Sequence, residues 1–304
     1  MALGSRRSVL FVSFLFVVRA FVIIPSTYQK FKNEVNRHDS KLKASNKLYG
    51  GDFAGLSANF SPKDGKLIRV PDHLVPKEIL EWEKSPSCLE VLVSEEGGEE
   101  EETWSRQTVS VLPAVGCGVD NLETTKKEEE MRVQSVSVAD DVVSFDVEYE
   151  DEDNKKKRRR TETIFAVGDN DDKNCYRLRV LLDIAWEEDG GFVIEEPINV
   201  ILERRVNETS SGGTIADQGG LTGSRVTELL GGGILKASSF CEASPTVSWG
   251  DTPQGIKLLN LPGNVTIACY EDPMQSPMML DIVHLNINKK GEANQQMMRR
   301  SYNA

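Results

Sequence analysis

Residues 142–149, VVSFDVEY, decide the fold class of this chain. The alternation of Val142, Phe145, Val147 and Tyr149 indicates a strand with one buried face and one solvated face. Eight further runs are rich in β-branched or alternating apolar residues: SRQTVSVLP (105–113), RVQSVSV (132–138), TETIFAV (161–167), YRLRVLLDIAW (176–186), PINVILERRV (197–206), GIKLLNL (255–261), NVTIACY (264–270) and MMLDIVHLNI (278–287). Many short strands separated by turn residues predict a mainly β chain, an antiparallel sandwich or barrel.

Helical signals are few. Residues 73–83, HLVPKEILEWE, place apolar residues on one side of a helix whose start Pro76 restricts. Residues 224–231, SRVTELLG, form the second candidate. Two charged segments, 94–103 and 148–163, have the composition of structureless loops. The first is interpreted as an acidic tip between two strands.

The N-terminus has the composition of a targeting sequence. Residues 1–20 combine Arg6 and Arg7 with the apolar run VLFVSFLFVV, which is typical of a signal peptide and too short to span a membrane. Residues 21–47 are rich in Lys and Ser and poor in acids, like a transit peptide. The cut before Phe21 resembles the two-part plastid presequence of algae with red-type secondary plastids. We therefore expect a location in the plastid stroma, with secretion as the alternative.

Charge narrows the choice of partners. The 304 residues carry a net charge of −12, which disfavours nucleic-acid binding because phosphates need a positive field. The basic run KKKRRR (155–160) has the composition of a nuclear-localisation or nucleic-acid patch, but it also follows acids with which it can pair across a hairpin. We prefer the hairpin. After residue 47 no run is long and apolar enough for a transmembrane helix.

Sequence motifs for catalysis or metal binding are missing. The five cysteines form no CxxC pair, and the three histidines stand in no HExxH motif. His284 alternates with Ile282 in an expected strand, which favours a structural role over a catalytic one. We expect no enzyme activity, no catalytic or metal-binding residues and no cofactor.

A turn-rich stretch at 167–175, VGDNDDKNC, divides the strands into two halves. The expected domains are residues 48–168 and 172–304, each a barrel of its own.

Two stretches carry a family resemblance. Gly51 and Phe53 open the first strand like the G-x-W start of lipocalin-type barrels, with Phe in place of Trp. The C-terminal part resembles the closing strands of a lipocalin-like (calycin) family of cyanobacteria and plastids, which runs from an LPxG turn to a final R-R-Y. The matching positions, with Ser301 inserted before the Tyr, are Leu261, Pro262, Gly263, Arg299, Arg300 and Tyr302.

The resemblance implies a fold and two functions. The family includes the chloroplast ATP-synthase biogenesis factor, whose members look like two calycin barrels in tandem. It therefore implies a non-enzymatic assembly factor that contacts subunits of a plastid complex, with ATP synthase the first candidate. Because the superfamily also contains bilin lyases, the alternative is a binder, carrier or lyase of a tetrapyrrole or other apolar ligand. Both rest on analogy of fold.

The resemblance also implies a contact that tests the tandem arrangement. In lipocalin-like barrels a C-terminal Arg packs on the aromatic ring of the first strand. Two separate barrels would keep Arg299 and Arg300 away from Phe53, so that the Arg would find an aromatic residue of its own half, with Trp186 and Tyr176 as candidates. One enlarged barrel would instead place a guanidinium on Phe53.

Overall fold

The computed structural model describes most of the chain after residue 47. The described residues are 48, 50–81, 86–96, 103–112, 123–132, 135–139, 142–150, 157–167, 176–186, 192–206, 250–251, 257–261, 264–271, 278–287 and 293–302. They belong to one compact unit, Ala44–Ala304. The signal and transit segments predicted at residues 1–47 and the helix predicted at 224–231 lie outside this set.

Strands make up almost all of the described structure, as expected. The first sheet contains eleven of them: β1 (Gly51–Phe60), β2 (Leu67–Ile68), β3 (Leu89–Glu96), β4 (Thr103–Val111), β5 (Glu123–Arg132), β6 (Ser135–Ala139), β7 (Val142–Glu150), β8 (Lys157–Val167), β9 (Tyr176–Trp186), β10 (Phe192–Ile194) and β11 (Ile198–Arg205). The second sheet contains β12 (Gly250–Asp251), β13 (Lys257–Leu261), β14 (Val265–Glu271), β15 (Met278–Ile287) and β16 (Ala293–Tyr302).

The first sheet has the strand order of an up-and-down meander. Its main path is β5-β4-β3-β1-β11-β9-β8-β7-β6, and every neighbouring pair is antiparallel. Eight antiparallel steps separate β5 from β6, so the two strands run in the same direction. Only residues 133–134 separate them in the chain. The segment β5–β6 therefore acts as one interrupted strand that pairs with β4 at its beginning and with β7 at its end. Together with the pairing of first and last strands, β1 and β11, this is the order of an eight-stranded antiparallel half-barrel, consistent with a calycin-like fold.

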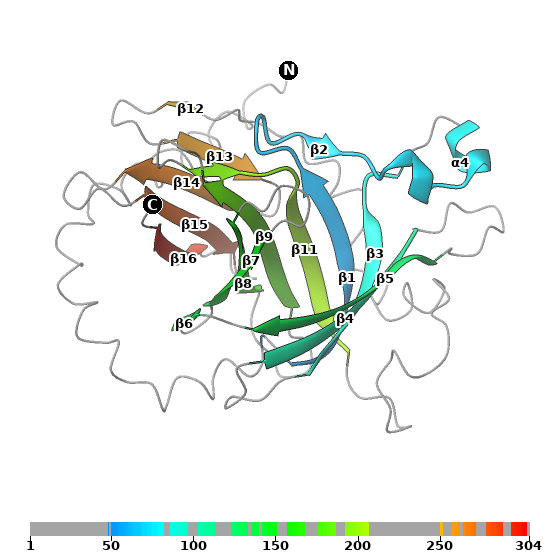
Figure 1. Ribbon diagram of the computed structural model, residues 1–304, viewed down its shortest axis with the longest axis horizontal. Helices are drawn as coiled ribbons and strands as arrows, with labels where there is room; N and C mark the ends of the chain where they lie inside the picture. The colour runs from blue at the N-terminus through cyan, green and yellow to red at the C-terminus, as the bar shows by residue number, and fades with distance from the viewer. Residues whose placement is uncertain are drawn as a thin grey trace, which may run out of the picture. The chain divides into compact units, whose positions relative to one another are not determined.

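Side-chain contacts identify the inner face of this curled sheet (Figure 1). Arg106 on β4 binds Glu162 on β8, although four strands lie between β4 and β8 in the sheet. A contact across so many strands requires the sheet to curl around that face. Phe165, three residues further along β8, lies on the opposite, outer face.

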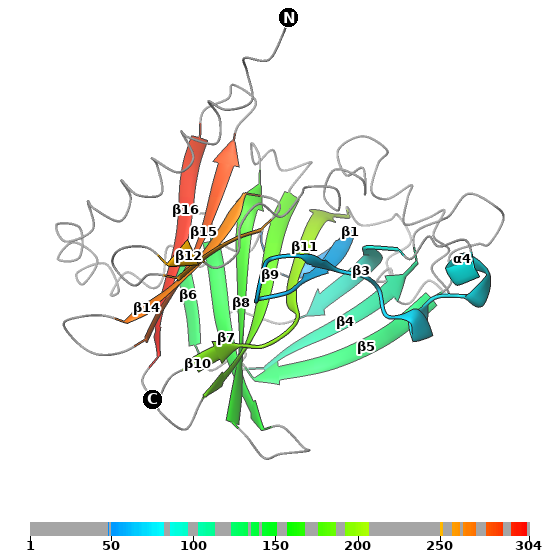
Figure 2. The ribbon, with the colours of Figure 1, turned by 90° about the horizontal axis from the view of Figure 1, so that it is seen from above.

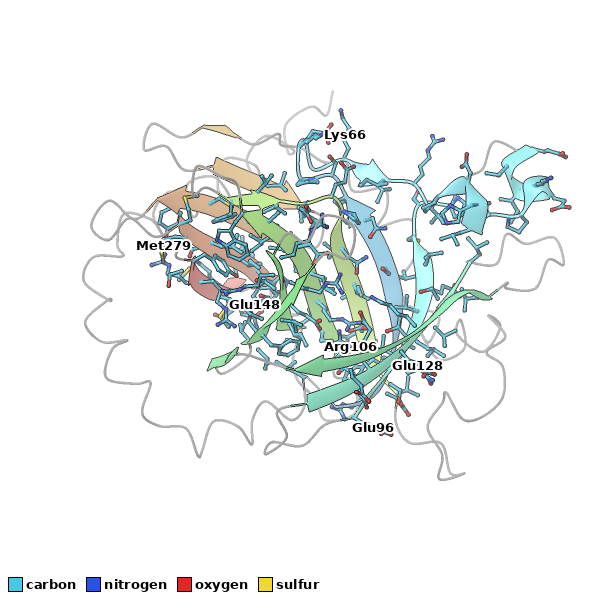
Figure 3. All side chains as sticks on the ribbon, viewed as in Figure 1. Lys66, Glu96, Arg106, Glu128, Glu148 and Met279 are labelled. Carbon is cyan, nitrogen blue, oxygen red and sulfur yellow. The ribbon has the colours of Figure 1, made fainter. Side chains whose placement is uncertain are left out.

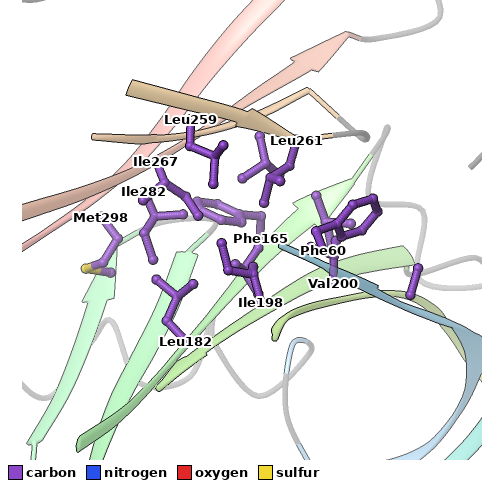
Figure 4. Packing of buried hydrophobic residues seen from close by; sticks show 14 of the residues in the cluster. Phe60, Phe165, Leu182, Ile198, Val200, Leu259, Leu261, Ile267, Ile282 and Met298 are labelled. Atoms are coloured by element: carbon purple, nitrogen blue, oxygen red, sulfur yellow. The ribbon is translucent and has the colours of Figure 1, made fainter. Parts of the chain in front are cut away.

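The second sheet packs on the outer face of the first (Figure 2). One apolar core joins the two sheets, and Phe165 and Leu182 from the first sheet meet Leu259, Ile267 and Ile282 from the second (Figure 4). Burial of this apolar surface supplies the main driving force for the association.

Among the described residues, helix is confined to the connection between β2 and β3. Residues 72–74 form a 3₁₀ turn, and α4 (Lys77–Glu81) begins directly after Pro76. The helix predicted over 73–83 is thus present in shortened form. Proline has no N–H and fixes its own φ, so it is tolerated at a helix start and not within the helix. Ile79 is buried against Val75 and Leu112.

Two sequence-based expectations need correction. The segment 148–163 is not a structureless loop, because β7 extends to Glu150 and β8 begins at Lys157. Two tandem barrels are also not what the strands form. The expected boundary at 167–175 separates β8 from β9, which are neighbours in one sheet, and β1 pairs with β11 from beyond that boundary. A single curled sheet with a separate second sheet replaces them.

Candidate functional site

Six charged side chains fill the inner face of the curled sheet where a lipocalin-like calyx would hold its ligand. They come from five strands, and none is more than 4% exposed: Glu95 on β3, Arg106 on β4, Glu162 on β8, Arg177 and Arg179 on β9, and Glu203 on β11. Figure 3 labels Arg106 at this position. We call these six residues the inner charge network.

Glu95 lies at the centre of the network. Its carboxylate accepts hydrogen bonds from Arg177 at 2.8 and 3.1 Å, from Arg106 at 3.0 Å and from Arg179 at 3.4 Å. The backbone N–H of Gly50 donates a further bond at 3.3 Å. One carboxylate therefore links the β3, β4 and β9 walls of the half-barrel.

The other two carboxylates complete the network. Nη1 and Nη2 of Arg106 each donate a hydrogen bond of 2.7 Å to the carboxylate of Glu162, which makes a bidentate pair across the curled sheet. Glu203 accepts from Arg177 at 2.6 Å and from Arg179 at 2.5 Å. Three positive and three negative side chains compensate one another, as buried charges must.

This arrangement fixes the protonation states. Burial alone would raise the pKa of Glu95, but the charges of Arg177 and Arg106 outweigh it and hold the pKa well below its usual range. The pKa of Glu162 is also lowered, because Arg106 and Arg179 outweigh the effect of its burial. A general acid or base works best with a pKa near the operating pH. The network lowers the pKa of both carboxyls further from neutral pH. Glu95 and Glu162 therefore act as fixed, paired charges.

Phe53 occupies the same inner face, and its contacts decide between the two arrangements considered above. The guanidinium carbon of Arg177 lies 3.3 Å from the centre of the Phe53 ring, and that of Arg205 lies 5.0 Å away. A guanidinium thus sits on the first-strand aromatic within one curled sheet, as expected for a single enlarged barrel. It comes from β9 and β11, however, and not from Arg299 or Arg300.

Two glycines of β1 make room for this packing. Gly51 has a φ of +95°, and a Cβ there would lie 3.1 Å from Nη1 of Arg205. At Gly55 a Cβ would lie 2.4 Å from the carbonyl oxygen of Leu202 and 2.7 Å from Cγ of Glu203. Sequence reasoning singled out Gly51 and missed Gly55, which lies two residues beyond Phe53.

The three arginines of the basic run, 158–160, pair with acids, and one of these pairs crosses the hairpin as predicted. Arg159 pairs with Glu148, directly opposite on β7. Arg160 binds Asp183 at 2.9 and 3.1 Å and reaches Glu129 of β5 at 3.4 Å. The last contact bridges β5 and β8 by side chains, and the described residues show no backbone ladder between these two strands.

Residues of the C-terminal motif join the second sheet to the first by hydrogen bonds and aromatic contacts. Tyr302 shares a 2.6 Å hydrogen bond with Thr161 of β8, and its ring meets those of Trp186 and Phe192 edge-on. Arg300 donates to the carbonyl oxygen of Ser144 at 2.8 Å. The predicted motif residues therefore serve the packing between the sheets.

Arg299 points to the other face of β16. It forms a bidentate pair with Asp281 at 2.7 Å, and its guanidinium lies 5.9 Å from the ring centre of Tyr270. This is an aromatic residue of its own half, as expected, but neither Trp186 nor Tyr176. Leu261 is buried and pairs with Val265 across the predicted turn. The turn residues Pro262 and Gly263 lie outside the described set.

His284 faces the core between the sheets. Its Nδ1 lies 2.8 Å from the side-chain oxygen of Gln296, and its ring centre lies 5.4 Å from that of Phe165. Burial lowers the pKa of His284 and favours the neutral ring. Its neighbours give it a packing role, which agrees with the structural interpretation.

In the part of the chain that the structure describes, no group of three or more His, Cys, Asp or Glu residues could hold a metal ion. Cys88 and Cys269 are buried, and neither forms a disulfide bond in the part of the chain that the structure describes. Among the same residues no helix has the length and apolar character needed to span a membrane.

No protein-family model matches the chain, and a search of curated proteins finds no match.

Proposed function

We propose that this protein is a non-enzymatic assembly or biogenesis factor that acts through protein–protein contacts. Its proposed partner is a plastid protein complex, with ATP synthase as the first candidate. The calycin-family resemblance and the N-terminal targeting composition motivate the plastid part of the proposal.

The inner charge network is the observation that carries this proposal. A calyx for a pigment or lipid needs an apolar interior with a few polar groups. Here six buried charged side chains occupy the inner face at the level of Phe53 and satisfy one another. An apolar ligand entering there would have to separate these pairs, at a cost of several kcal/mol for each charge left buried without its partner. This favours recognition through the outer surfaces and sheet edges.

The test is affinity purification of the tagged full-length chain from isolated plastids at low salt. We expect subunits of one complex to be recovered, and we expect their yield to fall as salt rises, because the chain carries a net charge of −12. Recovery of the protein alone at native abundance would contradict the proposal. A visible absorption band on the purified protein would instead support the ligand-carrier alternative.

A further inference from the structure

We propose that β16 is a docking edge at which an extended segment of a basic partner protein adds to the second sheet as a further strand. This inference rests on the proposed function and names the surface through which the partner is bound.

Comparison of the sheet edges singles out β16. In the described part of the chain, β5, β6, β12 and β16 end the main paths of the two sheets, while the short β2 and β10 pair off the main path of the first sheet. β5 carries five consecutive charged residues at 126–130, and its ladder with β4 is shifted by a bulge. β6 has five residues and β12 only two. Charges, bulges and short length are the devices by which proteins protect an edge from pairing with another chain.

Of these devices β16 carries only charges, on Arg299 and Arg300. It pairs with β15 over ten consecutive residues without a register shift, and it contains neither Lys nor Pro. The described residues place no strand on its other side. A regular ten-residue edge therefore presents backbone N–H and C=O groups in strand geometry.

One face of β16 is held against the first sheet. Met298 and Tyr302 are buried toward the first sheet. On the other face Gln295, Met297 and Ser301 are exposed, and Met297, at 37%, is one of two exposed large apolar residues in the described structure. The strand is thus anchored, while its outward face offers one apolar residue, Met297, between Gln295 and the ion-paired Arg299.

The two arginines of β16 do not repel an incoming strand. Arg299 is compensated by Asp281 at 2.7 Å, and Arg300 lies 3.8 Å from Asp146. With local charge balanced, backbone hydrogen bonds and an apolar contact with Met297 supply the recognition, as in β-augmentation.

The net charge of the chain indicates which kind of partner binds at β16. A second copy would also carry −12, so the two copies would repel each other during encounter. A partner of net positive charge would be attracted. The segment that fits is an extended one with an apolar residue opposite Met297, displayed by a basic protein.

The test compares two substitutions that introduce the same charge at exposed apolar positions. Met297→Lys places it on β16, and the matched control Val193→Lys places it on β10, where Val193 is 42% exposed. Neither change removes a buried side chain, so both variants should melt at the wild-type temperature. The full-length variants are used in the affinity purification described above.

Photoreactive groups at positions 297 and 193 then map the contact. We expect crosslinks from position 297 to fall in one segment of the recovered subunit, and a synthetic peptide of that segment should bind the wild-type protein. Met297→Lys should weaken its binding by about tenfold or more, whereas Val193→Lys should leave it unchanged.

Several results would overturn the proposal. If Met297→Lys recovers the partner as well as the wild type does, the proposed function stands but docking occurs elsewhere. A crosslink from position 297 to a second copy would replace the partner strand with self-pairing. Slow hydrogen exchange at every amide of β16 in the isolated chain would show that the edge is already covered. If even the wild type recovers nothing, both the docking edge and the proposed function fail.

Discussion

Replacing Glu95 with Gln should remove one charge from the inner network while keeping the shape of the side chain. Glu95 accepts bonds from three guanidinium groups, so the substitution leaves three arginines facing two carboxylates. Breaking a buried ion pair by neutralising one partner costs about 3–5 kcal/mol, because the remaining charge stays buried without compensation. For a domain stable by about 5–15 kcal/mol, this is a large share of the free energy of unfolding.

Urea unfolding followed by circular dichroism measures the loss, and two further variants interpret it. Glu96→Gln, on the same strand but exposed, should stay within about 0.5 kcal/mol of the wild type. Adding Arg179→Met to Glu95→Gln restores neutrality and keeps the bidentate Arg106–Glu162 pair, as well as the 2.6 Å contact between Arg177 and Glu203. The double variant should therefore be more stable than Glu95→Gln alone.

The pH dependence gives an independent check. Because the folded pKa of Glu95 lies below its ordinary value of 4.5, its contribution to stability is present above pH 4.5 and is lost as the pH falls below that value. Glu95→Gln should accordingly flatten the acid side of the stability curve. A loss of less than about 1 kcal/mol at pH 7, or a double variant as unstable as the sum of the two single changes, would refute the compensation argument.

Three further substitutions test other parts of the structure. Burial raises the pKa of Glu90 to about 7, so its ionisation costs stability as the pH rises from about 4.5 through 7. Glu90→Gln should therefore stabilise the protein at pH 8 by up to about 3 kcal/mol and have little effect at pH 4.5. Thermal melts at both pH values measure this difference. Tyr302→Phe removes the 2.6 Å bond to Thr161 and should cost about 1 kcal/mol, seen as a lower urea midpoint with an unchanged slope; a changed slope would mean that the fold itself had altered. Gly55→Ala should cost about 1–3 kcal/mol because its Cβ would meet the β11 backbone, and a wild-type melting temperature would contradict that close approach.

The sequence predicts the apolar strands well and the charged ones poorly. The expected runs at 142–149, 161–167 and 176–186 lie within β7, β8 and β9. β5, with the sequence ETTKKEEEMR, has no strand signal of its own. Its conformation is imposed by pairing with β4, a tertiary effect that local propensity cannot contain.

Alternation also left the location of the inner charge network open. In YRLRVLLDIAW, Arg177 and Arg179 alternate with Leu178 and Val180, which normally indicates a solvated polar face. The structure buries both faces, because the sheet curls around the arginines and the second sheet contributes to the core on the leucine side. A period of two separates the faces of a strand but does not say which face lies inside. The carboxylates that compensate Arg179 come from three other strands, 17, 24 and 84 residues away in the sequence.

The pairing of β1 with β11 has a consequence for biosynthesis. Asn199 binds Ser57 across 142 residues of chain, so a ribosome that adds about 5–20 residues per second needs roughly 7–30 s to supply the second partner after the first. During that time β1 can pair with β3 but has one edge open, and Leu56 and Phe60 lack the β11 side of their core. Contacts of such long range make folding slow and leave nascent chains prone to aggregation. The newly made protein therefore needs protection until residue 205 has emerged, and chains interrupted before β11 should accumulate as insoluble material.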